Sequence, residues 1–279
     1  GALPDGRCCN RKDFTMKRVM LTVAYDGTNY HGWQLQSNGI SIEEVLNRCL
    51  TQLLKEPVQV IGASRTDAGV HAWGNIAVFD TQARMPGEKF SYALNQRLPE
   101  DIRIRDSREV PADFHPRKTD SIKTYEYRIL NEEFPNPVKR LYSHFTYIPL
   151  DEKRMREAAL LFVGEHDFKS FCSVNAQVES TVRTIYSCDV AREGTELIIR
   201  ISGAGFLYNM VRIIAGTLME VGSGKYPPEA VKEMLEAKNR AAAGPTAPAR
   251  GLTLISYEFP ALKEKAGQQA AEEKSEKTV

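Results

Sequence analysis

The turn between residues 62 and 71 places three chemically useful side chains next to one another. Its sequence, Gly-Ala-Ser-Arg-Thr-Asp-Ala-Gly-Val-His, supplies a guanidinium at Arg65, a hydroxyl at Thr66 and a carboxylate at Asp67. A carboxylate that is ionised at neutral pH can form a covalent bond and release it again. Apolar segments flank the turn, so we expect two strands to hold it on a rigid frame. A solvated surface turn would fit the same three residues, so partners elsewhere in the chain must decide.

The segment from Phe206 to Val221 is expected to be a helix with an arginine outside its apolar stripe. The stripe at helical spacing consists of Phe206, Met210, Ile213, Ile214, Thr217, Leu218 and Val221. Arg212 falls on another face, which also carries Gly205 and Gly216. Small residues allow a second backbone to approach closely, with the guanidinium projecting into the gap. A surface arginine in solvent is the alternative interpretation.

The elements that must position these residues follow one pattern twice. In the first half, strand, helix, strand, strand, helix and strand are expected at 19–25, 41–54, 58–62, 72–80, 87–96 and 102–110. In the second half the same order is expected at 125–130, 151–163, 182–191, 196–203, 206–221 and 253–258, with a further short helix opened by two prolines at 227 and 228. The fold class is therefore α+β, with two fused ferredoxin-like units whose strands merge into one central antiparallel sheet.

Domain boundaries follow from the same pattern. We expect an N-terminal unit over residues 17–115 and a C-terminal unit over 116–260. Residues 1–16 precede the first strand and are expected to be a disordered extension. Residues 261–279 alternate charged residues, Ala and Gln without an apolar face, which is typical of a disordered tail.

Composition excludes several classes of protein. The 37 basic and 36 acidic residues give a net charge of +1, so a nucleic-acid partner would need a local basic patch. The five cysteines have no paired spacing and the five histidines have no zinc-ligand spacing, which favours reduced thiols in a cytoplasmic protein without a metal site. Two glycine-rich runs, at 203–208 and 222–225, lack residues that nucleotide-binding loops require. No apolar run approaches the roughly 20 residues that cross a bilayer.

Four motifs in order resemble the tRNA pseudouridine synthase A family. They lie at residues 24–34, 62–72, 123–127 and 206–212, and a closing strand at 251–254 is also similar. The resemblance runs from about residue 17 to 259, and the family's duplicated α/β fold agrees with the two units inferred from the pattern. It implies a cytoplasmic isomerase that converts uridine to pseudouridine at positions 38–40 of the tRNA anticodon stem-loop. The family needs no cofactor, flips its target base and commonly works as a homodimer.

The resemblance also implies roles for individual residues. Asp67 matches the catalytic carboxylate, which attacks either the base or ribose C1′, and the sequence leaves both routes open. A carboxylate buried beneath a base loses charge unless a cation pairs with it, and Arg212 matches that partner. Tyr125 matches the residue that stacks on the target base, and its phenol is a candidate to move the C5 proton. Arg65 matches the arginine that fills the stack left by the flipped nucleotide.

Further residues are expected to bind the substrate. The expected substrate-binding set is Arg65, Thr66, His71, Arg117, Lys118, Tyr125 and Leu252. Candidate phosphate ligands are Arg97, Arg103, Arg105, Arg117, Lys118 and Lys123, although basic residues of this kind are more often solvated side chains. Tyr208 and Asn209 occupy a pair that is often rich in histidine in relatives, so the roles of these two side chains are open.

Two alternatives from other classes remain at this point. The first is an RNA-binding module that uses the same α+β platform without catalysis. The second is an aspartyl-nucleophile hydrolase, which would need a metal-binding carboxylate beside Asp67, and the turn offers none.

Overall fold

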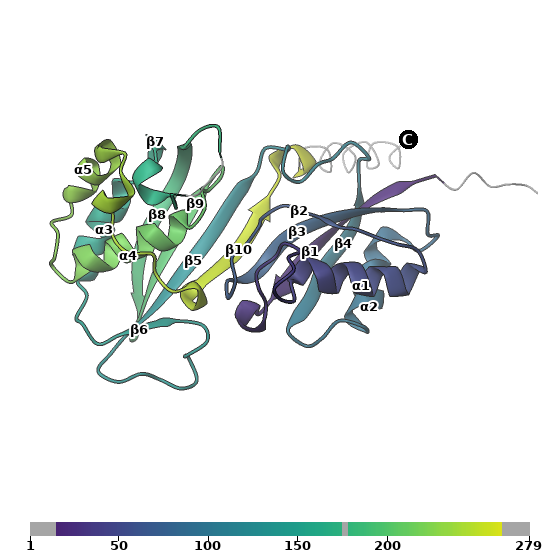
Figure 1. Ribbon diagram of the computed structural model, residues 1–279, viewed down its shortest axis with the longest axis horizontal. Coiled ribbons are helices and arrows are strands. Elements are labelled where there is room, and N and C mark those ends of the chain that lie inside the picture. The colour runs from purple at the N-terminus through teal and green to yellow at the C-terminus, as the bar shows by residue number, and fades with distance from the viewer. Residues whose placement is uncertain (1–14, 175–177, 264–279) are drawn as a thin grey trace, which may run out of the picture.

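A ten-stranded sheet runs the length of the computed structural model, which describes residues 15–174 and 178–263 (Figure 1). Its strands are β1 (Lys17–Tyr25), β2 (Ile61–Gly62), β3 (His71–Thr81), β4 (Ile102–Val110), β5 (Ile122–Asn131), β6 (His144–Thr146), β7 (Gly164–Asp167), β8 (Val182–Glu193), β9 (Glu196–Gly203) and β10 (Leu252–Glu258). The helices are α1 (Ile42–Leu54), α2 (Phe90–Asn95), α3 (Glu152–Leu160), α4 (Met210–Gly222) and α5 (Ala230–Ala237). Most strand pairs are antiparallel, which confirms a mixed α+β fold with one large sheet.

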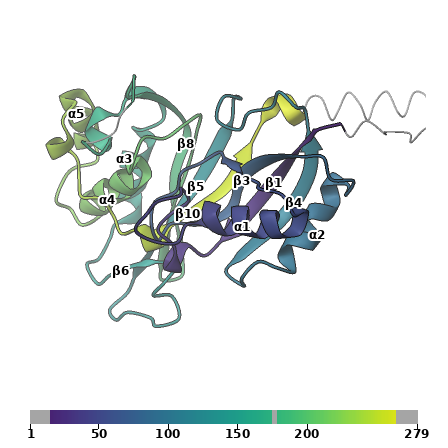
Figure 2. The ribbon, with the colours of Figure 1, turned by 45° about the vertical axis from the view of Figure 1, so that its right-hand side comes forward.

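The strand order is β4-β1-β3-β10-β5-β9-β8-β7, with β2 beside β3 and β6 beside β5. Strands β3 and β10 join the two halves through a short parallel pairing, Thr253 with His71 and Leu254 with Ala72. Helices α1 and α2 accompany the first half, and α3, α4 and α5 accompany the second, as both views show (Figures 1 and 2). The turn and the α4 helix that carry the predicted chemistry therefore belong to different halves of a continuous sheet.

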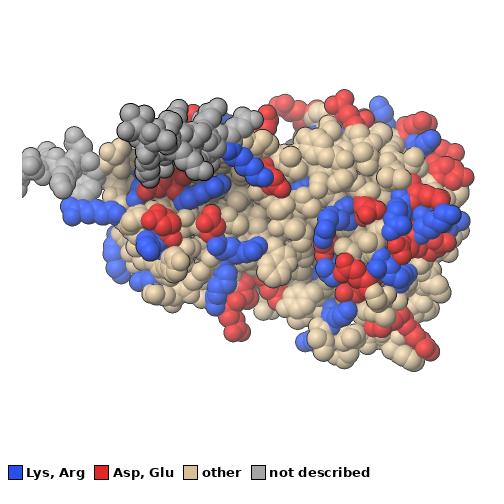
Figure 3. Space-filling view, turned by 180° about the vertical axis from the view of Figure 1, so that it is seen from behind, with Lys and Arg blue, Asp and Glu red and all other residues tan. Residues whose placement is uncertain are grey.

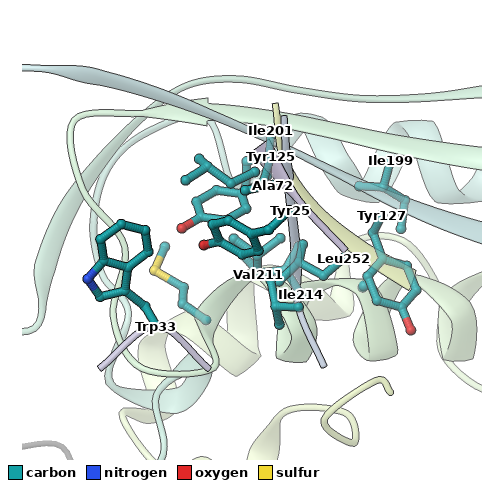
Figure 4. Packing of buried hydrophobic residues seen from close by; sticks show 14 of the residues in the cluster. Tyr25, Trp33, Ala72, Tyr125, Tyr127, Ile199, Ile201, Val211, Ile214 and Leu252 are labelled. Carbon is teal, nitrogen blue, oxygen red and sulfur yellow. The ribbon is translucent and has the colours of Figure 1, made fainter. Parts of the chain in front are cut away.

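Buried side chains of both halves form one main core. Tyr25 and Trp33 come from the first half and Tyr125, Val211 and Leu252 from the second, and Figure 4 shows them in a single packed cluster. Such shared burial holds the halves together, because separating them would expose apolar surface to water. Cys49, Cys172 and Cys188 are also buried and carry free thiols.

Helix α1 shows how local sequence determines an element. Its apolar stripe is buried, and the Ser41 hydroxyl accepts a hydrogen bond from the Glu44 amide, as a capping residue does. The expected strand 58–62 is wrong in length, because only Ile61–Gly62 pair as β2. Side chains of α1 bind the amides of Val58 and Val60 instead, at Thr51 Oγ1 and Asn47 Oδ1.

Two further differences separate the structure from the expected elements. Helix α4 begins at Met210 rather than Phe206, because Asn209 has a left-handed backbone with φ of 60°. Strands β6 and β7 were not expected, since each is short and without apolar alternation. Among the described residues the longest helices have 13 residues, and none is suited to span a membrane. The predicted extension and tail lie almost entirely outside the described residues.

Candidate active site

A cavity of about 580 Å³ lies where the turn of the first half meets α4 of the second. The turn contributes Arg65, Thr66 and Asp67, and strand β5 contributes Tyr125. Arg212 lines the same cavity from α4. Residues that are far apart in the sequence thus face one space that is large enough for a nucleotide-sized ligand.

Hydrogen bonds from neighbouring segments hold the turn in place. The amide of Trp33 donates to the Thr66 carbonyl at 3.0 Å, and the Tyr25 hydroxyl lies 2.6 Å from Thr66 Oγ1. The buried side-chain amide of Asn75 accepts from the Ser64 amide at 3.2 Å and donates to the Ser64 carbonyl at 2.9 Å. These contacts continue the β2–β3 pairing through a side chain, so the chain leaves the sheet in a defined direction just before Asp67.

Asp67 and Arg212 form the central ion pair of the cavity. Arg212 Nη1 donates to Asp67 Oδ2 at 3.3 Å, and Arg212 Nε donates to the Ala247 carbonyl at 2.7 Å. Gly216 allows the backbone of Pro245 to pass close to α4, since a Cβ on Gly216 would lie 1.8 Å from the Pro245 carbonyl oxygen. The expected close approach on this face is therefore present, and the guanidinium points at a carboxylate instead of solvent.

Burial and charge act in opposite directions on Asp67. Burial raises the pKa of its carboxyl, while the charge and hydrogen bond of Arg212 lower it, and the pKa ends above its ordinary value. Asp67 is the one carboxylate among the described residues that line the cavity. Within the described parts of the chain, no group of three or more His, Cys, Asp and Glu side chains is arranged to hold a metal ion.

Tyr125 forms a wall of the cavity beside this pair. Its ring packs edge-to-face on Phe206 with centroids 5.2 Å apart, and its hydroxyl lies 3.0 Å from Ser64 Oγ. Burial raises the pKa of Tyr125 to about 12, so the phenol is protonated at neutral pH. Phe206 was expected in the helix stripe, but it precedes α4 and supports the tyrosine ring.

The structure separates the other expected substrate-binding residues into two groups. Arg65, Thr66, Arg117, Lys123 and Leu252 line the cavity, and the side chains of Arg65 and Arg117 are exposed. Lys118 is exposed but lies outside the lining, as do Arg97, Arg103 and Arg105. On the face shown in Figure 3, Lys and Arg side chains are interspersed with Asp and Glu.

His71 lies outside the cavity lining, and its position gives it another task. The ring is buried, and its Nδ1 accepts a hydrogen bond from the Gly27 amide at 3.0 Å. Its Nε2 lies 2.9 Å from the Leu141 carbonyl, and Asp26 approaches Nδ1 at 3.2 Å. Nε2 also lies 3.2 Å from the Arg250 carbonyl, so His71 ties three loops to β3, and both ring nitrogens are already engaged.

Residues that the sequence pattern did not assign also reach the site. Ser64 contacts Tyr125, and Asn209 contacts Arg212, with Asn209 Oδ1 accepting from Arg212 Nη1 at 3.1 Å. The sequence indicated that Asn209 is unusual, because relatives often have histidine at this pair of positions. A single sequence could not show that the Asn209 side chain contacts Arg212.

Comparisons with known proteins agree over most of the chain. A family model described as tRNA pseudouridine synthase matches residues 21–117 and 158–260. A tRNA pseudouridine synthase A from Ruminiclostridium cellulolyticum is 48% identical over 245 residues, covering 88% of this chain and 100% of the relative. The tRNA pseudouridine synthase A of Acetivibrio thermocellus is 47% identical over 244 residues with the same coverage, and that of Geotalea uraniireducens is 48% identical over 240 residues, covering 86% and 98%. Because the family model matches segments in both halves of the sheet and these relatives align with most of the chain, the chain belongs to the tRNA pseudouridine synthase family.

Proposed function

We propose that this protein isomerises uridine to pseudouridine at positions 38–40 of the tRNA anticodon stem-loop, with Asp67 as the nucleophile and without a cofactor. Membership of the family supports an isomerase that acts on tRNA. The observation that carries the residue assignment is the Asp67–Arg212 pair, held 3.3 Å apart in a cavity that Tyr125 also lines.

The reaction replaces one glycosidic bond with another. The bond from ribose C1′ to N1 breaks, the base rotates, and a bond from C1′ to C5 forms, while C5 gives up a proton and N1 gains one. Nothing is oxidised, and the sum of atoms is unchanged. Asp67 forms a transient ester with either the base or C1′, and Arg212 stabilises the carboxylate before attack and after release.

The remaining cavity residues suit a flipped base. Tyr125 offers a flat ring beside the carboxylate on which the base can stack. Its protonated phenol lies within hydrogen-bond distance of the Ser64 hydroxyl, and we assign this phenol to the transfer of the C5 proton. Arg65 is exposed at the rim and can stack in the space that the base leaves. Arg117 and Lys123 also line the cavity, and we assign them contacts with phosphates, so that binding depends on the shape and backbone of the stem.

Assembly and domain organisation complete the proposal. We propose two ferredoxin-like units, 17–115 and 116–260, because the strand order β4-β1-β3 with β2 in the first half matches β10-β5-β9-β8 in the second. A homodimer acting in the cytoplasm follows from the resemblance to the family, and native mass measures the oligomeric state. We assign His71 a structural role, in which its ring holds neighbouring loops to β3. We assign Lys118 no contact with a nucleotide in the cavity.

Release of tritium from tRNA labelled at uridine C5 tests the function. Asp67→Asn is expected to lower the rate by on the order of 10³-fold or more while tRNA affinity stays within about tenfold, because the lost group acts chemically. Asp106→Asn, an exposed carboxylate on β4, is the matched control and should keep full activity. Activity of Asp67→Asn near that of the wild type would remove Asp67 from the mechanism. Transcripts with a single uridine at 38, 39, 40 or 55 test the position, and equal release from 55 would contradict the anticodon assignment.

A further inference from the structure

We propose that Asn209 is a positioning residue whose side-chain amide holds the Arg212 guanidinium in the orientation that pairs with Asp67. The inference rests on the function proposed above for the Asp67–Arg212 pair. It assigns a role to a side chain that contacts the arginine and has no part in the chemistry itself.

The guanidinium has three acceptors, and two of them fix its plane. Nε donates to the Ala247 carbonyl at 2.7 Å, and Nη1 donates to Asn209 Oδ1 at 3.1 Å. The same Nη1 reaches Asp67 Oδ2 at 3.3 Å, the longest of the three contacts. Because a guanidinium is planar and rigid, the Ala247 carbonyl and Asn209 Oδ1 together determine where Nη1 points. Ala247 alone would leave the group free to rotate about its last bonds.

Asn209 is itself anchored in place. Its Nδ2 donates to Ser173 Oγ at 2.8 Å, which fixes the amide so that Oδ1 faces Arg212. An asparagine that precedes a helix usually accepts from a helix amide through its side chain, but Asn209 makes no such capping bond. The side chain therefore serves Arg212 and Ser173 instead of the helix end.

The backbone of Asn209 supports the same conclusion. Three non-glycine residues of the described chain have positive φ, and they are Lys55, Asn209 and Lys238. Lys55 and Lys238 end helices α1 and α5, where a left-handed residue is usual. Asn209 adopts φ 60° and ψ 7° at the start of α4, on the wall of the cavity. A less favourable conformation kept at a site is a reason to look for a function, and it is the conformation that carries the amide to Arg212.

The charges around the pair make the role measurable. Besides Asp67 and Arg212, the ionisable groups that line the cavity are Arg65, Arg117, Lys123, Tyr125 and Tyr208. None of these five side chains is a carboxylate, so a carboxylate introduced at position 209 would be the first to compete with Asp67 for Arg212 among the described residues of the lining. Asp67 must be ionised to attack, and kcat therefore falls as the pH drops through its pKa.

Two substitutions at Asn209 separate positioning from folding. Asn209→Gly removes the amide but suits positive φ, so the thermal midpoint should not fall, whereas kcat should drop about 10- to 100-fold with KM within about threefold. Asn209→Asp keeps the backbone preference and adds a carboxylate on the guanidinium, so the acidic limb of the kcat profile should move to higher pH. The matched control is Lys55→Gly, which replaces an exposed residue of φ 60° outside the cavity and should leave kcat unchanged.

A measurement without substrate keeps this inference distinct from the proposed function. Carbon-13 NMR titration of the Asp67 carboxyl should give a higher pKa in Asn209→Gly than in the wild type, because the cation is less well held. Wild-type kcat in folded Asn209→Gly, or an acidic limb that stays in place in Asn209→Asp, overturns the positioning role. If Asp67→Asn remains active, the proposed chemistry fails, while the titration still reports whether Asn209 orients Arg212.

Discussion

Gly216 lies where α4 meets the backbone of Pro245, and replacing it with alanine is expected to damage catalysis more than stability. A Cβ on Gly216 would lie 1.8 Å from the Pro245 carbonyl oxygen, whereas real Cβ contacts stay at 3.0 Å or more. The segment that contains Pro245 must therefore move by at least the difference, 1.2 Å. Two residues later, Ala247 accepts the 2.7 Å hydrogen bond from Arg212 Nε.

The same displacement at Ala247 would lengthen that hydrogen bond beyond about 3.2 Å, the usual limit for an N–H donor. Arg212 would then lose its shortest contact, and a shift of about 1 Å in a catalytic group can cost about 100-fold in rate. We expect kcat of Gly216→Ala to fall about 10- to 100-fold. Stability should change less, because alanine gains about 1 kcal/mol of helix propensity while overpacking costs about 1–3 kcal/mol.

Tritium release under saturating tRNA gives kcat, and urea unfolding gives the free energy of unfolding. Gly205→Ala is the matched control, since a Cβ there meets no atom closer than 3.7 Å, in the Arg183 side chain. It should behave as the wild type in both assays. A folded Gly216→Ala protein with kcat within threefold of the wild type would refute the link from Pro245 to Arg212.

Two more predictions concern stability. Asp67→Asn should raise the melting temperature at pH 7. The pKa of the Asp67 carboxyl is raised in the folded state, so its contribution to folding stability is full below the ordinary pKa of 3.8. That contribution is lost as the pH rises through the folded-state pKa. The difference from wild type should vanish near pH 3, and a lower melting temperature for Asp67→Asn at pH 7 would contradict it. Asn75→Leu should cost about 2–6 kcal/mol in urea unfolding, since the buried amide and carbonyl of Ser64 lose their partner at about 1–3 kcal/mol each. A loss below about 1 kcal/mol would show that Ser64 finds other partners.

Elements with strong local signals were predictable from the sequence. The strand over 102–110 has the expected bounds, and α1 starts after Ser41 as its capping pattern indicates. The strand over 58–62 failed because α1 side chains took its backbone amides, a competition that no local pattern reveals. Helix α4 was placed four residues early, because apolar spacing continues through Phe206 although the backbone does not.

The residues of the site were recognisable by type, but most of the contacts that hold them in place were not. Spacing alone indicated a carboxylate on a tight turn, and family resemblance indicated its cation. Only the structure shows that His71 lies outside the cavity lining and that its ring nitrogens contact loop backbone. It also identified Asn209 and Ser64, whose contacts depend on side-chain direction.

The sequence by itself determined which chemical groups the chain can offer: a carboxylate at Asp67, a guanidinium at Arg212 and an aromatic ring at Tyr125. Tertiary structure alone decided that these groups meet, since Asp67 and Arg212 lie 145 residues apart in the chain. The physical reason is that periodicity reports which faces are buried, whereas the choice of partner depends on how the two halves pack. The balance of burial against charge that sets the pKa of Asp67 exists only once that packing is formed.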